Sequence, residues 1–179
     1  MDKKADVWVS AVIYVGLVIT ILTIVLAAGL PVINRMRDKN TATETRDIMH
    51  ELDSTIRDVI RDGPGAQRTP IIKISKGEFV INQDSVVWTL QNSKFMFSQS
   101  GEEVREGNLV VLTTNSPVED QYVVQIALKI PTSVRLLPQI KTLSGQYSLL
   151  IKNNGVMTDT TDPLTPVKYT GIEINELTI

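Results

Sequence analysis

Hydrophobic residues follow three successive patterns along this chain. From Val7 to Ile33 the sequence is apolar almost throughout. From Asn34 to Asp62 apolar residues recur every three or four positions among charged ones. After Gly65 apolar and polar residues alternate with a period of two. In order, these patterns predict an apolar helix, an amphipathic helix and a series of β-strands.

The apolar segment is long enough to cross a membrane. No charged residue falls between Asp6 and Arg35, whereas a helix needs about 20 apolar residues to cross a hydrocarbon core. The apolar region of a cleaved secretory signal is only about 7–15 residues long. We therefore expect residues 6–33 to form a transmembrane or otherwise buried helix that is retained in the mature protein.

The amphipathic pattern extends this helix over residues 34–62. One apolar stripe recurs at intervals of three and four residues and comprises Ile48, Met49, Leu52, Ile56, Val59 and Ile60. Such a stripe predicts a helix with one face against a core. The run Gly63-Pro64-Gly65 then predicts the end of the helix.

Residues 66–179 are predicted to form an all-β domain. Short alternating segments are expected near residues 71–75, 79–81, 86–90, 95–97, 109–113, 122–130, 147–152 and 167–175. Turns are expected at Ser75-Lys76-Gly77 and at Asn153-Asn154-Gly155. The predicted class is therefore α+β, with a long N-terminal helix followed by an antiparallel β-sandwich-like domain.

Small residues form a stripe within the apolar segment. Gly16, Thr20, Thr23 and Ala27 follow one another at spacings of 4, 3 and 4, which places them on one helical face. Small residues let helix backbones approach closely, and threonine hydroxyls hydrogen-bond between helices. This stripe predicts a packing surface for another helix.

A helix kink is expected near the end of the apolar segment. Pro31 has no amide hydrogen and its ring conflicts with the carbonyl four residues earlier, and Gly29 precedes it closely. Because the helical pattern resumes directly, we expect a kink at Gly29 and Pro31 rather than an end.

Composition argues against the usual catalytic and nucleic-acid-binding sites. The chain has no cysteine, one histidine (His50) and a formal net charge of −2. Disulfides, thiolate metal sites and multi-histidine metal sites are thereby excluded within one chain, and a basic surface for nucleic acid is not expected. No paired carboxylates or phosphate-binding loop stand out, so we expect no enzyme, no cofactor and no metal, and interpret His50 as a surface or packing residue.

The N-terminal residues complete a recognisable order of parts. Lys3, Lys4 and Ala5 directly precede Asp6 and the apolar helix, which continues into an amphipathic helix and a β-rich domain. This arrangement resembles the type IV pilin superfamily, and within it the archaeal pilins and archaellins. The resemblance implies a leader, residues 1–5, that a prepilin peptidase removes between Ala5 and Asp6. Ser10 occupies the place where many bacterial pilins carry a glutamate, which favours the archaeal branch.

The resemblance also implies a function. Pilin subunits are stored in the membrane and assemble through their N-terminal helices into a cell-surface filament, with the β-domain outside. The expected partners are therefore other copies of the chain, the membrane, the peptidase and the pilus assembly machinery.

An alternative interpretation is a membrane-anchored binding module. In it, a single-pass β-domain is presented to a partner, as a minor pilin or a stator-like component of a filament machine. The positive charge near the apolar segment leaves both interpretations open, because Arg35, Arg37 and Lys39 outnumber Lys3 and Lys4. By the positive-inside rule this count favours an outside N-terminus, opposite to that of a pilin.

Overall fold

The computed structural model describes residues 3–139, 142–159 and 166–177. The side chains of residues 3–9 and of Ser144 lie outside this description. The chain divides into two compact units, an N-terminal unit, Met1–Arg37, and a C-terminal unit, Asp38–Ile179. Helix α1, Lys3–Asp62, contributes residues to both units.

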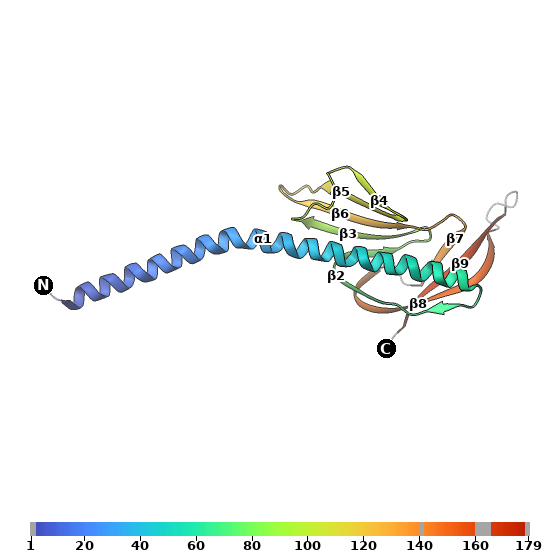
Figure 1. Cartoon of the computed structure of the whole chain (residues 1–179), viewed down its shortest axis with the longest axis horizontal. Helices are drawn as coiled ribbons and strands as arrows, with labels where there is room; N and C mark the ends of the chain where they lie inside the picture. Colours follow the sequence, from blue (N-terminus) through green and yellow to red (C-terminus); the bar gives the residue numbers. More distant parts are fainter. Residues whose placement is uncertain (1–2, 140–141, 160–165, 178–179) are drawn as a thin grey trace. The chain divides into compact units, whose positions relative to one another are not determined.

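The C-terminal unit contains one large β-sheet (Figure 1). Within the described ranges its strands are β1 (Gln67–Arg68), β2 (Ile71–Ile81), β3 (Ser85–Ser93), β4 (Glu103–Glu106), β5 (Leu109–Asn115), β6 (Tyr122–Lys129), β7 (Val134–Pro138), β8 (Thr142–Asp159) and β9 (Val167–Leu177). They are ordered β4-β5-β6-β3-β2-β8-β9-β7, with β1 paired to β8. All neighbouring pairs are antiparallel except β7 and β9, which are parallel.

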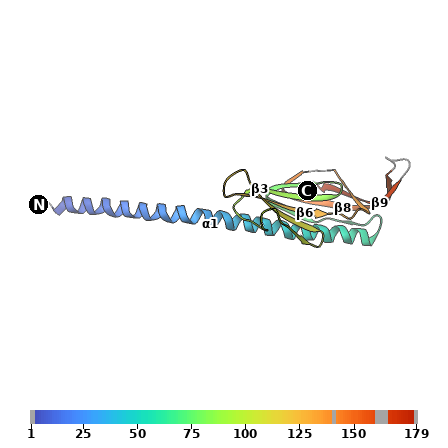
Figure 2. The ribbon, with the colours of Figure 1, turned by 90° about the horizontal axis from the view of Figure 1, so that it is seen from above.

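The hydrophobic core lies between one face of this sheet and the helical residues 38–62. Helix residues Met49, Leu52 and Val59 are buried together with Phe79 and Trp88 from the sheet. Along β3 the buried residues alternate with half-buried ones, as expected for a strand with one covered face. Figure 2 shows the strands on one side of these helical residues. The amphipathic stripe predicted from the sequence is therefore the face that covers the sheet.

The predicted α+β class is confirmed, but the β-domain differs from a sandwich. The strands form a single curled mixed sheet, and helical residues 38–62 supply the second layer. A sheet with one apolar face needs one covering layer, and the helix provides it. At one end of the sheet the amide of Leu136 in β7 donates to the carbonyl of Gln83, 2.8 Å away, in the turn between β2 and β3. That contact shields part of an edge strand.

Three sequence predictions of local structure were wrong. Ser75-Lys76-Gly77 is a bulge inside β2 and not a turn, because the pairing of β2 with β8 shifts register between Ile74 and Phe79. Asn153-Asn154-Gly155 likewise lies within β8, where the register with β9 shifts. Phe95 and Phe97 lie in an irregular loop after β3, and their rings pack edge to face instead of alternating across a strand.

Candidate functional site

The apolar segment of α1 presents side chains that nothing in the described chain covers. Its large apolar residues range from 47% exposed at Ile33 to 68% exposed at Val12. Among the described residues, α1 is the one helix that is long and apolar enough to cross a membrane. A helix that is hydrophobic on all sides is stable only when lipid or other protein surrounds it. This segment is therefore the main candidate for a functional surface.

The small-residue stripe lies on the exposed surface of α1. The hydroxyl of Thr20 donates to the carbonyl of Gly16 and that of Thr23 to the carbonyl of Ile19, both at 2.8 Å. A Cβ atom added at Gly16 would meet no atom within 4 Å. No contact within the chain therefore requires glycine at this position. The role of Gly16, Thr20, Thr23 and Ala27 in packing against another helix stays a prediction.

Two other sets of predicted residues lie in α1. The helix continues through Gly29 and Pro31, so the proline does not end it, and the kink stays a prediction. Lys3, Lys4, Ala5 and Asp6 also belong to the helix, but their side chains lie outside the described part of the structure. Cleavage after Ala5 is thus a prediction from the sequence alone.

Asp38 anchors the first helical turn of the C-terminal unit, which sequence reasoning did not foresee. Asp38 is only 4% exposed. One carboxylate oxygen accepts a hydrogen bond from the ammonium of Lys76 at 2.7 Å, and the other accepts one from the amide of Lys94 at 2.7 Å. Buried carboxylates are stable when paired in this way. The helix is thereby tied to β2 and to the loop that follows β3.

The bulge in β2 positions Lys76 for this ion pair. Gly77 adopts φ of +90°, a conformation that side chains rarely tolerate. The Trp88 indole donates to the carbonyl of Lys76 at 2.9 Å, on the other side of the bulge. Next to it, the Ser75 hydroxyl lies 3.1 Å from a carboxylate oxygen of Glu44 in the helix. A charged side chain followed by glycine within an alternating segment was the available sequence signal for such a bulge.

The middle of the helix is joined to the hairpin of β4 and β5. Glu106 lies 2.7 Å from the guanidinium of Arg46 and 3.5 Å from Nε2 of His50. The buried carboxylate of Asp53 accepts from Arg57 and, at 3.1 Å, from the Asn108 amide. His50 thus lies in a contact between the helix and the sheet, in keeping with its interpretation as a surface or packing residue.

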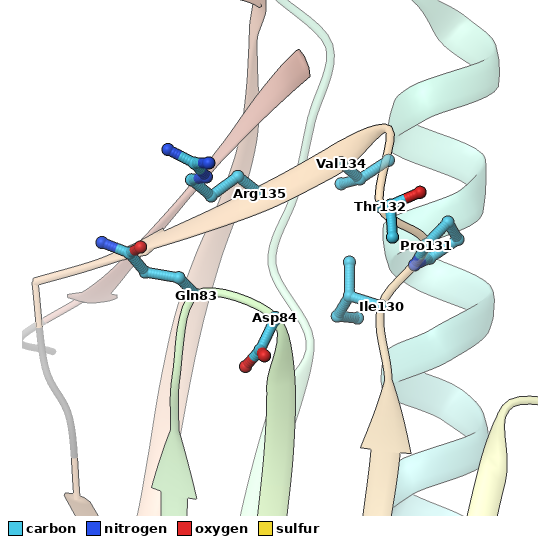
Figure 3. Close-up of a pocket in the computed structure, with 7 residues that line it drawn as sticks. All are labelled: Gln83, Asp84, Ile130, Pro131, Thr132, Val134 and Arg135. Atoms are coloured by element: carbon cyan, nitrogen blue, oxygen red, sulfur yellow. The ribbon is translucent and has the colours of Figure 1, made fainter. Parts of the chain in front are cut away.

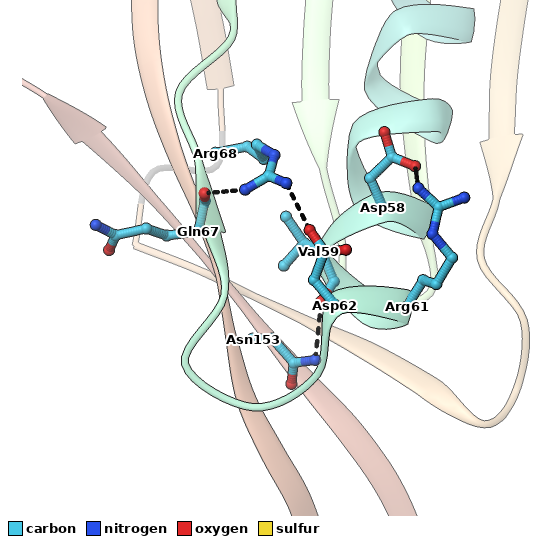
Figure 4. A network of polar contacts seen from close by, with 7 residues as sticks. All are labelled: Asp58, Val59, Arg61, Asp62, Gln67, Arg68 and Asn153. Atoms are coloured by element: carbon cyan, nitrogen blue, oxygen red, sulfur yellow. Dashed lines mark hydrogen bonds and ion pairs between the residues drawn. The ribbon is translucent and has the colours of Figure 1, made fainter.

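A second anchor holds the end of the helix (Figure 4). The buried side chain of Asn153 in β8 donates from Nδ2 to the carbonyl of Val59 at 3.1 Å, and its Oδ1 accepts from the amide of Gly155 at 2.8 Å. Nearby, Arg68 of β1 pairs with Asp62, the last helical residue, at 2.5 Å. The last four carbonyls of a helix have no partner within it, and Asn153 satisfies one of them.

One cleft lies between the β2–β3 turn and the segment that leads into β7 (Figure 3). It has a volume of about 500 Å³ and is lined by Gln83, Asp84, Ile130, Pro131, Thr132, Val134 and Arg135. The Arg135 guanidinium is bound to Asp159 at 2.7 Å and stacks 4.3 Å from the Tyr169 ring centroid.

Polar contacts hold the charged side chains that line this cleft. Hydrogen bonding to Asp159 raises the pKa of Arg135 above its ordinary value. Asp84 accepts a hydrogen bond from Ser85 at 2.9 Å. Each of the two charged groups is therefore held by a neighbouring polar side chain. In the part of the chain described here, no group of three histidine, aspartate or glutamate side chains is placed to hold a metal ion.

Comparisons of the chain with protein-family models, with curated protein sequences and with solved structures gave no match.

Proposed function

We propose that this protein is the structural subunit of an archaeal type IV pilus-like filament and assembles through its N-terminal helix after removal of residues 1–5. The observation that carries the proposal is the exposed apolar segment of α1, whose large side chains are all at least 47% exposed over residues 12–33. A bilayer covers such a helix before assembly, and neighbouring copies cover it afterwards.

The C-terminal unit supports the same proposal. Helical residues 38–62 are held against the sheet by Asp38, Asp53 and Asn153, so the β-domain and this part of α1 move together. A domain held in this way at the end of an assembling helix is displayed at the surface of a filament. In this proposal the β-domain lies outside the cell and the apolar segment forms the filament core.

Mass spectrometry of the assembled protein tests the leader. We expect the mature chain to begin at Asp6, because the two lysines and Ala5 form the peptidase recognition sequence in this proposal. Polymers sheared from the cell surface would be digested and their N-terminal peptide sequenced. Filaments whose subunits retain Met1 to Ala5 would contradict the pilin assignment.

Substitution of the small-residue stripe tests assembly. We expect Gly16→Leu together with Thr20→Leu to lower the amount of sheared polymer at least about tenfold, which corresponds to about 1.4 kcal/mol of association free energy. Leucine at these positions separates helix backbones that small residues bring together. The matched control is Val18→Leu with Val25→Leu, which adds bulk on other faces of the same segment.

The amount and location of polymer separate the two proposed functions. Polymer at the wild-type level in the Gly16/Thr20 variant would refute the stripe as a packing surface. If the wild-type protein is found only as a membrane-bound monomer, the alternative of an anchored binding module is supported instead. The excess of Arg35, Arg37 and Lys39 over Lys3 and Lys4 favours an outside N-terminus, opposite to that of a pilin, and so leaves room for this alternative.

A further inference from the structure

The helical residues 38–62 run the length of the β-domain, and the domain has one end beside Asp38 and the other beside Asp62. At one end, Asp38 accepts the amide of Lys94, and the ammonium of Lys94 donates to the carbonyl of Asp120 at 3.4 Å. At the other end, the side chain of Asn153 binds the carbonyl of Val59. Two residues further along β8, Gly155 lies beside Pro64. From Asp38 to Asp62 a helix extends about 36 Å. The two ends are therefore separated by about that distance.

The end beside Asp38 carries an apolar and acidic patch. We define this proximal patch by Met96, Val118 and Glu119, which lie in the loops after β3 and β5. Val118 is 47% exposed and Met96 is also exposed. The two loops adjoin, since the ammonium of Lys94 reaches the carbonyl of Asp120, and the hydroxyl of Ser116 donates to the side-chain oxygen of Asn92 at the end of β3 at 2.8 Å. Asp120 adds a second exposed carboxylate, and Lys94 is the neighbouring cation.

The opposite end carries an uncovered apolar and basic face. In the hairpin of β8 and β9, Val156 pairs with Thr170 and Thr158 pairs with Lys168. Cross-strand pairs share a face of the sheet, so Val156, Thr158 and Lys168 form one surface, which we name the distal face. Ile172, two residues beyond Thr170, is buried in the core. The distal face is thus the continuation of the core-facing side of the sheet.

Helix α1 ends before it covers this continuation. It stops at Asp62, and β8 and β9 continue past that point in both views (Figures 1 and 2). Val156 is consequently 71% exposed, although its side of the sheet is covered elsewhere by the helix. In the described residues neither Lys168 nor Glu119 forms an ion pair. The distal face, with Val156 and the unpaired Lys168, therefore complements the proximal patch, with Val118 and the unpaired Glu119.

We propose that the proximal patch of one subunit packs head to tail against the distal face of a second copy. This inference rests on the proposed filament function and adds a contact between β-domains to the contact between helices. The two patches differ and lie at opposite ends of the domain, so the contact is heterologous. Repeated heterologous contacts build open linear assemblies when they do not close into a ring.

Thiol cross-linking tests the contact, because the natural chain contains no cysteine. The full-length chain carrying both Val118→Cys and Val156→Cys would be treated with a short bismaleimide in intact cells. We expect a ladder of dimers, trimers and higher multimers in denaturing gels. Val104→Cys with Val156→Cys is the matched control, since Val104 is exposed on edge strand β4, and it should give no ladder.

Charge reversal provides a second, independent measurement. We expect Glu119→Lys and Lys168→Glu each to lower the cross-linked fraction at least about fivefold in the double-cysteine chain, and the combination of both to restore it. Lys73→Glu, at an exposed position elsewhere on the sheet, should leave it unchanged.

The outcomes distinguish this inference from the proposed function. Polymers at the wild-type level without a ladder, or without rescue by the double reversal, overturn the head-to-tail contact and leave the filament proposal standing. A chain that never leaves the membrane fraction overturns the filament proposal. In that case a ladder within the membrane still supports the contact, and its absence overturns the contact as well.

Discussion

Replacing Gly77 by alanine is expected to lower the free energy of unfolding of the C-terminal unit by about 3–4 kcal/mol. The residue has φ of +90°, which costs an alanine about 1–2 kcal/mol. In addition, a Cβ atom there would lie 2.6 Å from Nε1 of Trp88 and 2.8 Å from the carbonyl oxygen of Thr89. The indole must then move, and its hydrogen bond to the Lys76 carbonyl is lost.

Thermal unfolding of the full-length chain in detergent measures this effect. Fluorescence of the buried Trp88 reports the core directly, and a Trp8→Phe background removes the second tryptophan. A loss of 3–4 kcal/mol lowers the melting temperature by roughly 10 °C in a domain of this size. Gly101→Ala is the matched control, because Gly101 has φ of +84° and nothing within 4 Å of an added Cβ.

The comparison of the two glycines isolates the steric contribution. Gly101→Ala carries the backbone cost alone, about 1–2 kcal/mol. Equal losses at Gly77 and Gly101 would show that the contact with Trp88 contributes nothing. Backbone strain alone would then explain the loss at Gly77, and the indole hydrogen bond to the Lys76 carbonyl would not stabilise the bulge.

Replacing Asn153 by alanine is expected to cost about 2–4 kcal/mol. The side chain links the carbonyl of Val59 to the amide of Gly155, and both groups are left without this partner in the variant. Each buried polar group without a hydrogen bond costs about 1–3 kcal/mol. We expect a lower melting temperature and faster amide hydrogen exchange in the last turns of the helix.

The neighbouring asparagine supplies the control. Asn154 is exposed and its amide donates to Glu173 at 3.0 Å, so Asn154→Ala should cost less than about 1 kcal/mol. Similar losses at the two positions would show that Asn153 contributes no more than an exposed hydrogen bond. Faster exchange confined to β8, with an unchanged helix end, would also contradict its role as an anchor.

Several elements could be predicted from the sequence because their signals are local. Helix α1 contains the uncharged segment before Arg35 and the stripe from Ile48 to Ile60. It ends directly before the Gly63-Pro64-Gly65 run. Alternation from Tyr122 to Ile130 likewise predicted β6, which covers Tyr122–Lys129. In these cases neighbouring residues alone decide which conformation buries the apolar side chains.

Bulges and anchors could not be predicted because they depend on distant residues. Glycine with a positive φ occurs in turns and in bulges alike, so Gly77 and Gly155 suggested strand ends where the strands in fact continue. The register of the partner strand decides between the two. The aromatic alternation at Phe95 and Phe97 was misleading for a similar reason. The preceding residue, Lys94, donates its amide to Asp38, and this contact holds the loop to the helix.

The sequence alone therefore determined that this protein has an uncovered apolar helix, an amphipathic continuation and a β-rich domain, because each is set by hydrophobic periodicity. Tertiary structure decided that the strands form one mixed sheet, that Asp38 and Asn153 hold the helix against it, and that the hairpin of β8 and β9 extends beyond the helix end. These features arise from pairings between residues far apart in the chain. A single sequence contains the partners, but only the folded chain brings them together.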